Sequence, residues 1–141
     1  MPDYIIKFRT PGDNLTPIRG DNDVSRKDWI RYAEHHWGDI KETDTLNVAE
    51  GRDVKDVKHI CPLQLGVIRR LVMLFSLRDE IVFSPFCGIG SEGYESILHH
   101  RRFYGCEIKD TYFRAAKLNC QRAVASRSEQ MGLFELDAVR P

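Results

Sequence analysis

Three glycines at the end of a short apolar run constrain the fold of this chain more than any other feature. Residues 88–93 read G-I-G-S-E-G, which matches the spacing G-x-G-x-x-G. They follow residues 81–83, I-V-F, an uninterrupted apolar run that predicts a strand buried on both faces. Ser91 is a residue type that caps helices, so the spacing predicts a helix from Ser91 to about His100.

The same order of elements is repeated immediately downstream. Residues 103–106, F-Y-G-C, predict a second strand, and Asp110 predicts the cap of a long helix that ends near Val124. Strand, helix, strand, helix is the pattern of parallel strands joined by helices. The sequence therefore predicts an α/β fold with part of a doubly wound sheet.

The residue types around the glycines suit an adenosine-bearing cofactor. Glycines let the backbone turn tightly against a ligand, and Glu107, at the end of the second predicted strand, can accept hydrogen bonds from ribose hydroxyls. Residues 84–87 separate the first strand from Gly88, whereas a dinucleotide fingerprint brings its first glycine directly off the strand, so nicotinamide chemistry is disfavoured. The alternative is that the glycines only form a turn and Glu107 is a solvated carboxylate.

Three segments in order resemble one family. Residues 84–90, S-P-F-C-G-I-G, resemble the D-P-F-x-G-x-G motif of amino DNA methyltransferases that modify adenine N6 or cytosine N4. Residues 59–68 are similar to that family's H-P-x-Q-K-P-L-x-L-I segment, and residues 101–108 resemble its R-R-F-x-G-x-E strand. The resemblance is specific over residues 57–124 and points to phage and prophage members, including those of restriction-modification type.

The resemblance implies a partial Rossmann-like methyltransferase fold that binds S-adenosylmethionine. By it, Phe86, Gly88 and Gly90 would line the methionine and adenosine moieties, Glu107 would hold the ribose, and His59 would begin a loop against the methionine end. Ser84 stands where the family usually has an aspartate. The implied cofactor-binding residues are His59, Ser84, Phe86, Gly88, Gly90 and Glu107.

The family's catalytic motif is absent from this sequence. Methyl transfer to an exocyclic amine requires a flipped base, which the family holds with a D/N/S-P-P-Y/F/W motif, and no such run occurs here. We therefore assign no catalytic residue and expect the cofactor-binding, C-terminal part of a longer DNA methyltransferase. An open sheet edge and an apolar face would need a partner, either a complementary catalytic half or a second copy. The alternative is a truncated, non-catalytic domain that binds DNA or protein as a regulator.

We expect a single domain over residues 1–141 with two regions. Residues 1–56 resemble a remnant of a recognition region, with a strand at 4–9 and a helix at 26–36 capped by Ser25. A polar connector from 38 to 58 joins them to the second region. Residues 57–141 form the S-adenosylmethionine-binding region. This region opens with a helix from Pro62 to about Ser76, and residues 133–136 predict one more strand.

Composition excludes several other classes. Lys and Arg balance Asp and Glu at 21 each, so any DNA contact must come from a local patch. No signal or membrane-spanning run is evident, which favours a soluble cytoplasmic protein. The four widely spaced cysteines argue against zinc and disulfides, and the pairs at 35–36 and 99–100 are histidines without a metal-ligand spacing. Trp29 and Trp37 are expected to belong to a core stripe.

Overall fold

The computed structural model of the chain describes residues 4–13, 16, 24–46 and 62–138, with side chains as far as residue 129. Within these ranges no helix is long and apolar enough to cross a membrane. The described part of the chain contains six elements: α1 (Arg26–Tyr32), α2 (Leu65–Phe75), β1 (Ile81–Ser84), α3 (Ser91–Leu98), β2 (Arg102–Gly105) and α4 (Asp110–Ala138).

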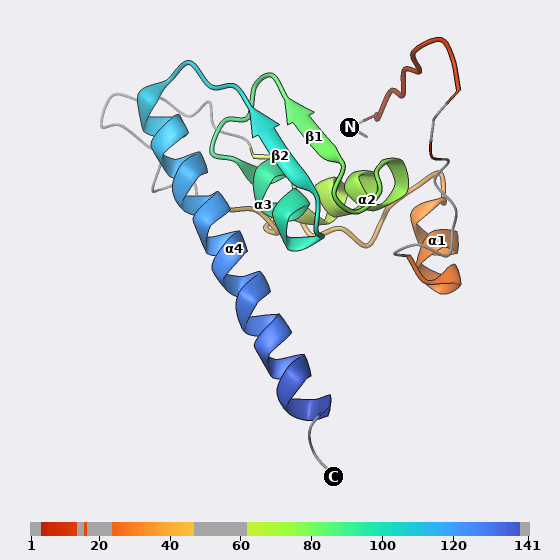
Figure 1. Cartoon of the computed structure of the whole chain (residues 1–141). Coiled ribbons are helices and arrows are strands. Elements are labelled where there is room, and N and C mark those ends of the chain that lie inside the picture. The colour runs from red at the N-terminus through yellow and green to blue at the C-terminus, as the bar shows by residue number, and fades with distance from the viewer. Residues whose placement is uncertain (1–3, 14–15, 17–23, 47–61, 139–141) are drawn as a thin grey trace.

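The two described strands form a parallel pair joined by a helix. Ile81 lies opposite Arg102, and Ser84 lies opposite Gly105, so both strands end at the same edge of the sheet. Helix α3 connects the strands and packs against both of them (Figure 1). The predicted β-α-β order is confirmed, and the chain is an α/β protein with a small parallel sheet.

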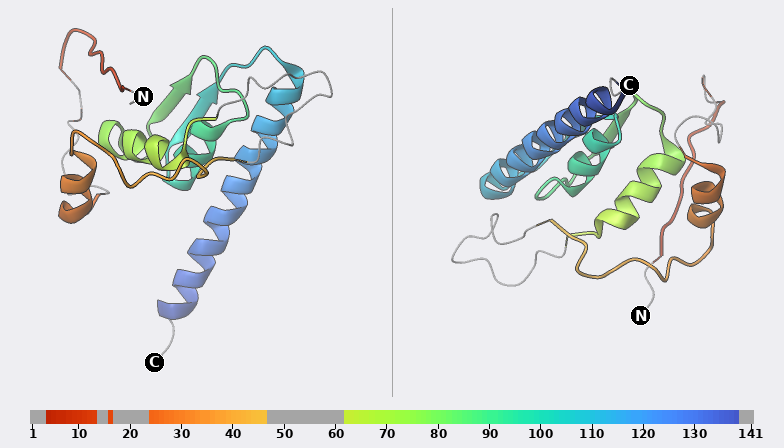
Figure 2. Two further views of the ribbon diagram at one scale, coloured as in Figure 1. Left: turned by 180° about the vertical axis from the view of Figure 1, so that it is seen from behind. Right: turned by 90° about the horizontal axis from the view of Figure 1, so that it is seen from below.

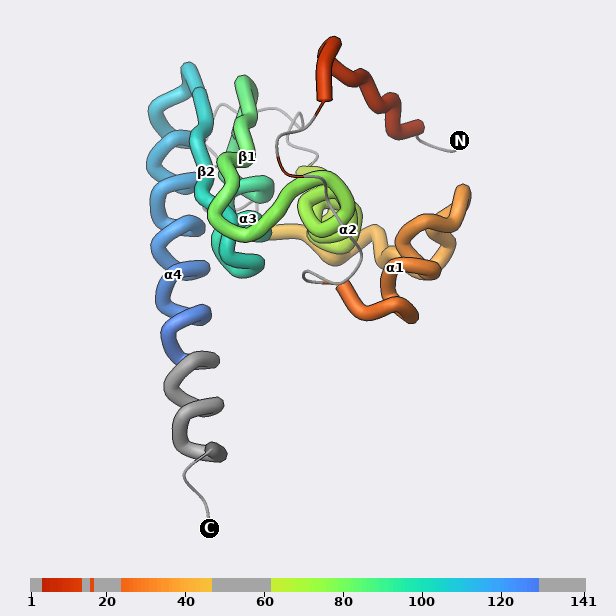
Figure 3. Tube along the Cα trace, turned by 45° about the vertical axis from the view of Figure 1, so that its right-hand side comes forward, coloured from red at the N-terminus to blue at the C-terminus, as the bar shows by residue number. Residues whose placement is uncertain are grey.

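The helices lie in a row beneath the sheet. Helix α3 packs between α4 and α2, and α1 packs on the far side of α2 (Figure 2). Figure 3 shows α4 and α1 at opposite ends of this row. Helix α4 continues well past the other elements (Figure 1). The glycine loop between β1 and α3 is therefore held between the sheet and α4.

The core is small and contains several paired charges. Apolar side chains from α2, the glycine loop and α4 make up its buried part: Ile68, Val72, Leu74, Cys87, Ile89, Ala115, Ala116 and Ala123. The fully buried Glu95 of α3 accepts hydrogen bonds from the Arg69 guanidinium at 3.2 and 3.4 Å. Buried carboxylates require such partners, because an isolated buried charge is strongly unfavourable.

Helix α1 begins as predicted but ends early. The Ser25 hydroxyl accepts the backbone N–H of Asp28 at 3.1 Å, which confirms the predicted cap. The helix ends at Tyr32 rather than near residue 36. The indole N–H of Trp37 donates to the Tyr32 carbonyl oxygen at 3.1 Å. A side chain thus satisfies a carbonyl group of the last turn, which has no partner within the helix.

Helix α2 is shorter than predicted because its first turn is capped from elsewhere. It spans Leu65–Phe75 instead of residues 62–76, and the side chain of its N-cap residue, Gln64, makes no capping hydrogen bond. Asp44 provides the cap: its carbonyl oxygen accepts the Leu65 N–H at 2.7 Å, and its carboxylate accepts the Gly66 N–H at 3.1 Å. No local sequence pattern could identify a capping residue so far away along the chain.

Several sequence-based expectations are wrong. Residues 4–9 do not form a strand, since neither described strand pairs with them. Residues 133–136 continue α4 instead of forming a strand. Gly90, not Ser91, is the N-cap of α3. Of the predicted connector, residues 38–46 contain no helix or strand, and the remainder lies outside the described residues.

The strand β1 is not buried on both faces. Ile81 is 58% exposed and Phe83 is 56% exposed. The Phe83 ring stacks on Tyr104 of β2 at 5.9 Å between centroids, and Tyr104 is also exposed. Helix α3 covers one face of the strand pair, and the described residues leave these side chains uncovered on the other. The expected apolar face is therefore present.

Candidate functional site

The glycine loop extends the sheet by two backbone hydrogen bonds. Beyond the last paired residues, the Cys106 N–H donates to the Ser84 carbonyl oxygen, and the Cys87 N–H donates to the Cys106 carbonyl oxygen, both at 2.9 Å. These bonds hold the start of the loop against the segment that follows β2. The carboxyl ends of parallel strands are where open α/β sheets bind ligands.

The Glu107 carboxylate, which follows β2, accepts a hydrogen bond from Gly88, which follows β1. Its Oε2 accepts the Gly88 N–H at 2.9 Å, and its Oε1 accepts the Lys109 N–H at 2.9 Å. Gly88 has a φ of +51°, which favours glycine, and no atom lies within 4 Å of where its Cβ would be. The loop therefore places a carboxylate beside a stretch of backbone that a ligand can approach closely.

Gly90 has a different role. Its φ is +84°, and a Cβ there would lie 2.9 Å from both the Cα and the Cβ of Ala116 on α4. Gly93 is also tightly packed, since a Cβ would lie 2.7 Å from the Phe103 ring and 2.8 Å from the Cys120 sulfur. The second and third glycines thus serve close packing of the loop and α3 against α4 and β2.

An asparagine on α4 holds the glycine loop by a hydrogen bond. The Asn119 amide nitrogen donates to the Ile89 carbonyl oxygen at 2.9 Å, and Asn119 is buried. None of the sequence-based expectations included this residue. Its signal is a polar side chain on the helix face that also carries Ala116 and Ala123, because a buried polar group needs a partner.

Two carboxylates give this loop a negative environment. Burial is the main reason that the pKa of the Cys87 thiol rises to about 11, and the negative charges of Glu107 and Glu92 raise it further. Burial also raises the pKa of Glu92, in the first turn of α3. A site with carboxylates in a partly buried loop favours a ligand that carries positive charge.

The structure brings together some of the predicted site residues. Ser84 is buried at the end of β1, next to the loop in which Gly88 contacts Glu107. Phe86 lies in the same loop and is 84% exposed. Gly90 faces α4 rather than open space. His59 lies outside the described residues.

Other residues noted in the sequence do not add to this site. His99 pairs with Glu95 at 3.3 Å, and the described residues contain no group of three or more His, Cys, Asp or Glu that could hold a metal ion. The expectation that Trp29 belongs to the core is wrong, because it is 38% exposed and α1 has no buried residue. Trp37 is half-buried and is held by Tyr32.

The chain resembles solved structures of a candidate DNA modification methylase. TTHA0409 from Thermus thermophilus, a candidate DNA modification methylase solved in complex with S-adenosyl-L-methionine, is 25% identical, with a TM-score of 0.61 over 88% of this chain and 48% of that one. A second structure of that protein is 25% identical, with a TM-score of 0.62 over 82% of this chain and 42% of that one. The chain thus spans about half the length of the structures it matches, and no curated protein sequence matches it.

The sequence model of one protein family covers most of the chain. The family is described as DNA methylase, and its model matches residues 2–118, which include the glycine loop, Glu107 and the Ala116 that packs against Gly90. With the predicted motifs, the fold and the match in agreement, the chain belongs to the DNA methylase family.

Proposed function

We propose that this chain is the S-adenosylmethionine-binding part of a site-specific DNA methyltransferase that methylates an exocyclic amine, adenine N6 or cytosine N4. The observation that carries the proposal is the hydrogen bond between Glu107 and Gly88, which sets a carboxylate beside open backbone at the ends of both strands. On this proposal the two strands are part of an incomplete doubly wound, Rossmann-like sheet, and the helices pack beside it.

The residues present fit such a cofactor. Each Glu107 oxygen accepts one backbone N–H and retains a lone pair that can accept a ribose hydroxyl. The space beside Gly88 lets a ligand approach the loop, and the exposed Phe86 ring can cover an apolar or aromatic part of it. When bound, the cofactor supplies an electrophilic methyl group on a positively charged sulfur. The negative charges of Glu107 and Glu92 complement that positive charge.

The remaining predicted residues have supporting roles in this proposal. The hydroxyl of Ser84 lies at the end of β1 and can orient a polar part of the cofactor. Gly90 holds the loop against α4, so it acts through packing. His59 would complete the methionine end of the site by resemblance alone.

Catalysis on this proposal needs a second set of residues. The sequence contains no D/N/S-P-P-Y/F/W run, so the group that would hold the target amine must come from a complementary catalytic half or from elsewhere in a longer protein. The exposed Ile81, Phe83 and Tyr104 on one face of the sheet support such a partner, because large contiguous apolar patches mark interaction surfaces. DNA is the proposed substrate.

A titration tests the cofactor assignment. Calorimetry with S-adenosylmethionine should show saturable binding by the wild type, and Glu107→Ala should weaken it about ten- to hundredfold, since hydrogen bonds to a charged group contribute about 1.5–3 kcal/mol. Glu34→Ala is the matched control, because Glu34 is exposed and lies outside the site. Absence of binding by folded wild type, or equal weakening by both variants, would contradict the proposal.

A second candidate function is a non-catalytic regulator that binds protein or DNA. The exposed apolar face over β1 and β2 favours it, because that surface can hold a partner whether or not a cofactor binds. Retained partner binding together with no S-adenosylmethionine binding would support this second candidate over the first.

A further inference from the structure

A polar pocket lies on the other side of α2 from the glycine loop. It has a volume of about 540 Å³ and lies between α1, the segment 39–44 and the start of α2. Charged side chains dominate its lining: Arg31, Asp39, Lys41, Asp44, Arg69 and Arg70. Neither the glycine loop nor Glu107 contributes to it.

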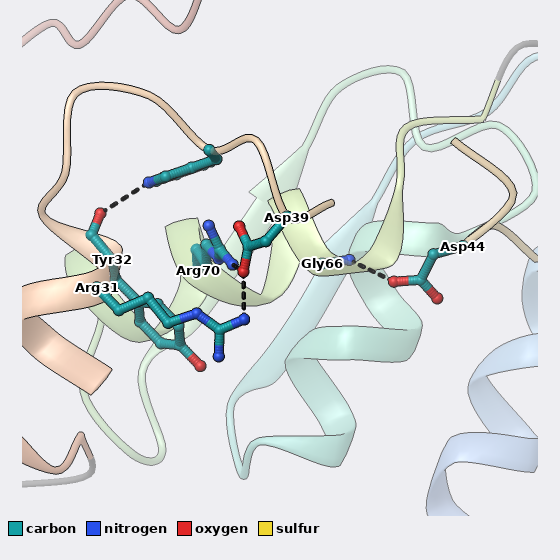
Figure 4. A network of polar contacts seen from close by, with 7 residues as sticks. Arg31, Tyr32, Asp39, Asp44, Gly66 and Arg70 are labelled. Atoms are coloured by element: carbon teal, nitrogen blue, oxygen red, sulfur yellow. Dashed lines mark hydrogen bonds and ion pairs between the residues drawn. The ribbon is translucent and has the colours of Figure 1, made fainter. Parts of the chain in front are cut away.

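Arg70 is held rigidly in the wall of this pocket. Its guanidinium lies 5.2 Å from the ring centroid of Tyr32 and 5.1 Å from that of Trp37. Its Nη2 donates to the Asp39 carboxylate at 2.6 Å (Figure 4). The side chain is only 7% exposed, so packing and hydrogen bonding fix its position before any ligand arrives.

The other terminal nitrogen of Arg70 is unsatisfied. Among the described residues, Nη1 is buried and has no hydrogen-bond partner. A buried donor without an acceptor is unfavourable, and such groups in native proteins call for an explanation. Arg70 lines the pocket, so an oxygen anion that reaches Nη1 from there would satisfy this donor. The exposed side chain of Lys41 can adjust around such an anion.

The charges around the pocket leave an excess of positive charge. One carboxylate, that of Asp39, is shared by the guanidinium groups of Arg31 and Arg70. The Asp44 carboxylate accepts the Gly66 N–H, and Lys41 has no ion-pair partner among the described residues. Arg69 is already paired with Glu95. Three cations therefore face two carboxylates, and this imbalance favours an anion.

We propose that this pocket binds a phosphate group, with Arg70, Lys41 and Arg31 as its cationic residues. A guanidinium has a planar set of donors that matches phosphate oxygens, and a partly desolvated pocket strengthens the charge-assisted hydrogen bonds. The phosphate can belong to a DNA backbone or to a free phosphate or nucleotide. The inference does not depend on cofactor binding at Gly88.

Trp37 provides a reporter within the site. The sequence has two tryptophans, so Trp29→Phe leaves Trp37, which stacks on Arg70, as the single fluorophore. Titration of this protein with inorganic phosphate at constant ionic strength should give a saturable change in fluorescence. Circular dichroism of each variant confirms that it is folded.

Charge reversal at an exposed residue tests the assignment without disturbing the buried arginine. In the Trp29→Phe background, Lys41→Glu should weaken phosphate binding about tenfold, because it replaces an attractive charge with a repulsive one in the site. Lys27→Glu makes the same change on α1, outside the pocket lining, and should leave the dissociation constant nearly unchanged.

The outcomes distinguish a DNA phosphate from a free phosphate or nucleotide, and both of these from the absence of a phosphate site. Competition by a short DNA duplex, lost in Lys41→Glu, assigns the site to a phosphodiester. Phosphate binding without competition by DNA assigns it to a free phosphate or nucleotide. No saturable signal, or equal weakening by Lys41→Glu and Lys27→Glu, overturns the proposal.

Discussion

Gly90→Ala should destabilise the chain strongly because two separate costs act at that position. The residue has a φ of +84°, and left-handed backbone costs a non-glycine residue about 1–2 kcal/mol. The new Cβ would also lie 2.9 Å from Ala116 Cα, and forcing extra volume into a packed site costs about 1–3 kcal/mol. We expect a total loss of about 2–5 kcal/mol in the free energy of unfolding.

Gly88→Ala is the matched control. Its φ of +51° is also left-handed, but no atom lies within 4 Å of the new Cβ, so only the backbone cost of about 1–2 kcal/mol applies. Urea unfolding followed by circular dichroism gives both free energies by linear extrapolation. The difference between the variants isolates the contact of the loop with α4.

Equal destabilisation by the two variants would refute this reasoning. It would mean that Gly90 is present only for its backbone conformation and that α4 does not restrict the loop. A larger loss in Gly88→Ala than in Gly90→Ala would reverse the roles assigned to the two glycines.

Three further results are expected. An alkylating reagent at pH 8 should label the exposed Cys106 long before Cys87, as peptide mass spectrometry would show. Burial and nearby carboxylates raise the pKa of Cys87 to about 11, so its thiol stays protonated. Fast labelling of Cys87 would contradict this. Asp39→Asn should cost about 1–2 kcal/mol rather than the 3–5 of a fully buried pair, because the Asp39 side chain is 39% exposed. Its arginine partners lower the pKa of Asp39 in the folded protein. The stability that these ion pairs add should therefore be complete above the ordinary aspartate pKa of about 3.9 and lost as the pH falls through the lowered folded-state value. If Asp39→Asn lowers the free energy of unfolding by the same amount at all acidic pH values, the pairing is refuted. Ile81→Thr should cost about 1 kcal/mol or less by urea unfolding, whereas Ile68→Thr should cost several times more, since the first side chain is 58% exposed and the second is 3% exposed.

The parts of the fold with strong local signals were predictable from the sequence. The Ser25 cap depends on neighbouring residues. The parallel β-α-β order and the position of Glu107 beside the glycine loop follow from a motif of known spacing. The sequence resemblance predicts that Gly88 and Gly90 both line the cofactor. In the structure Gly88 faces open space, whereas Gly90 packs against α4. Backbone angle alone does not distinguish a glycine that faces open space from one that faces Ala116.

The remaining features depend on contacts between distant residues. Asp44 caps α2 from 22 residues away, and Asn119 supports the loop from 30 residues away, so neither follows from a local pattern. The apolar run at 81–83 predicted burial on both faces, but burial depends on what covers the strand, and one face has no covering element among the described residues. Residues 4–9 have a strand-like composition, yet a strand also requires a neighbour to pair with.

The central claim is that Glu107 holds the ribose of S-adenosylmethionine, and a ligand-residue cycle tests it most directly. Calorimetry would compare S-adenosylhomocysteine with its 2′-deoxy analogue on the wild type and on Glu107→Ala, so that any general loosening of the loop cancels in the ratio. The account predicts that the wild type binds the deoxy analogue about tenfold or more weakly, and that the variant binds both ligands nearly equally. Equal discrimination by the two proteins would show that Glu107 only connects Gly88 to Lys109 and does not contact the ribose.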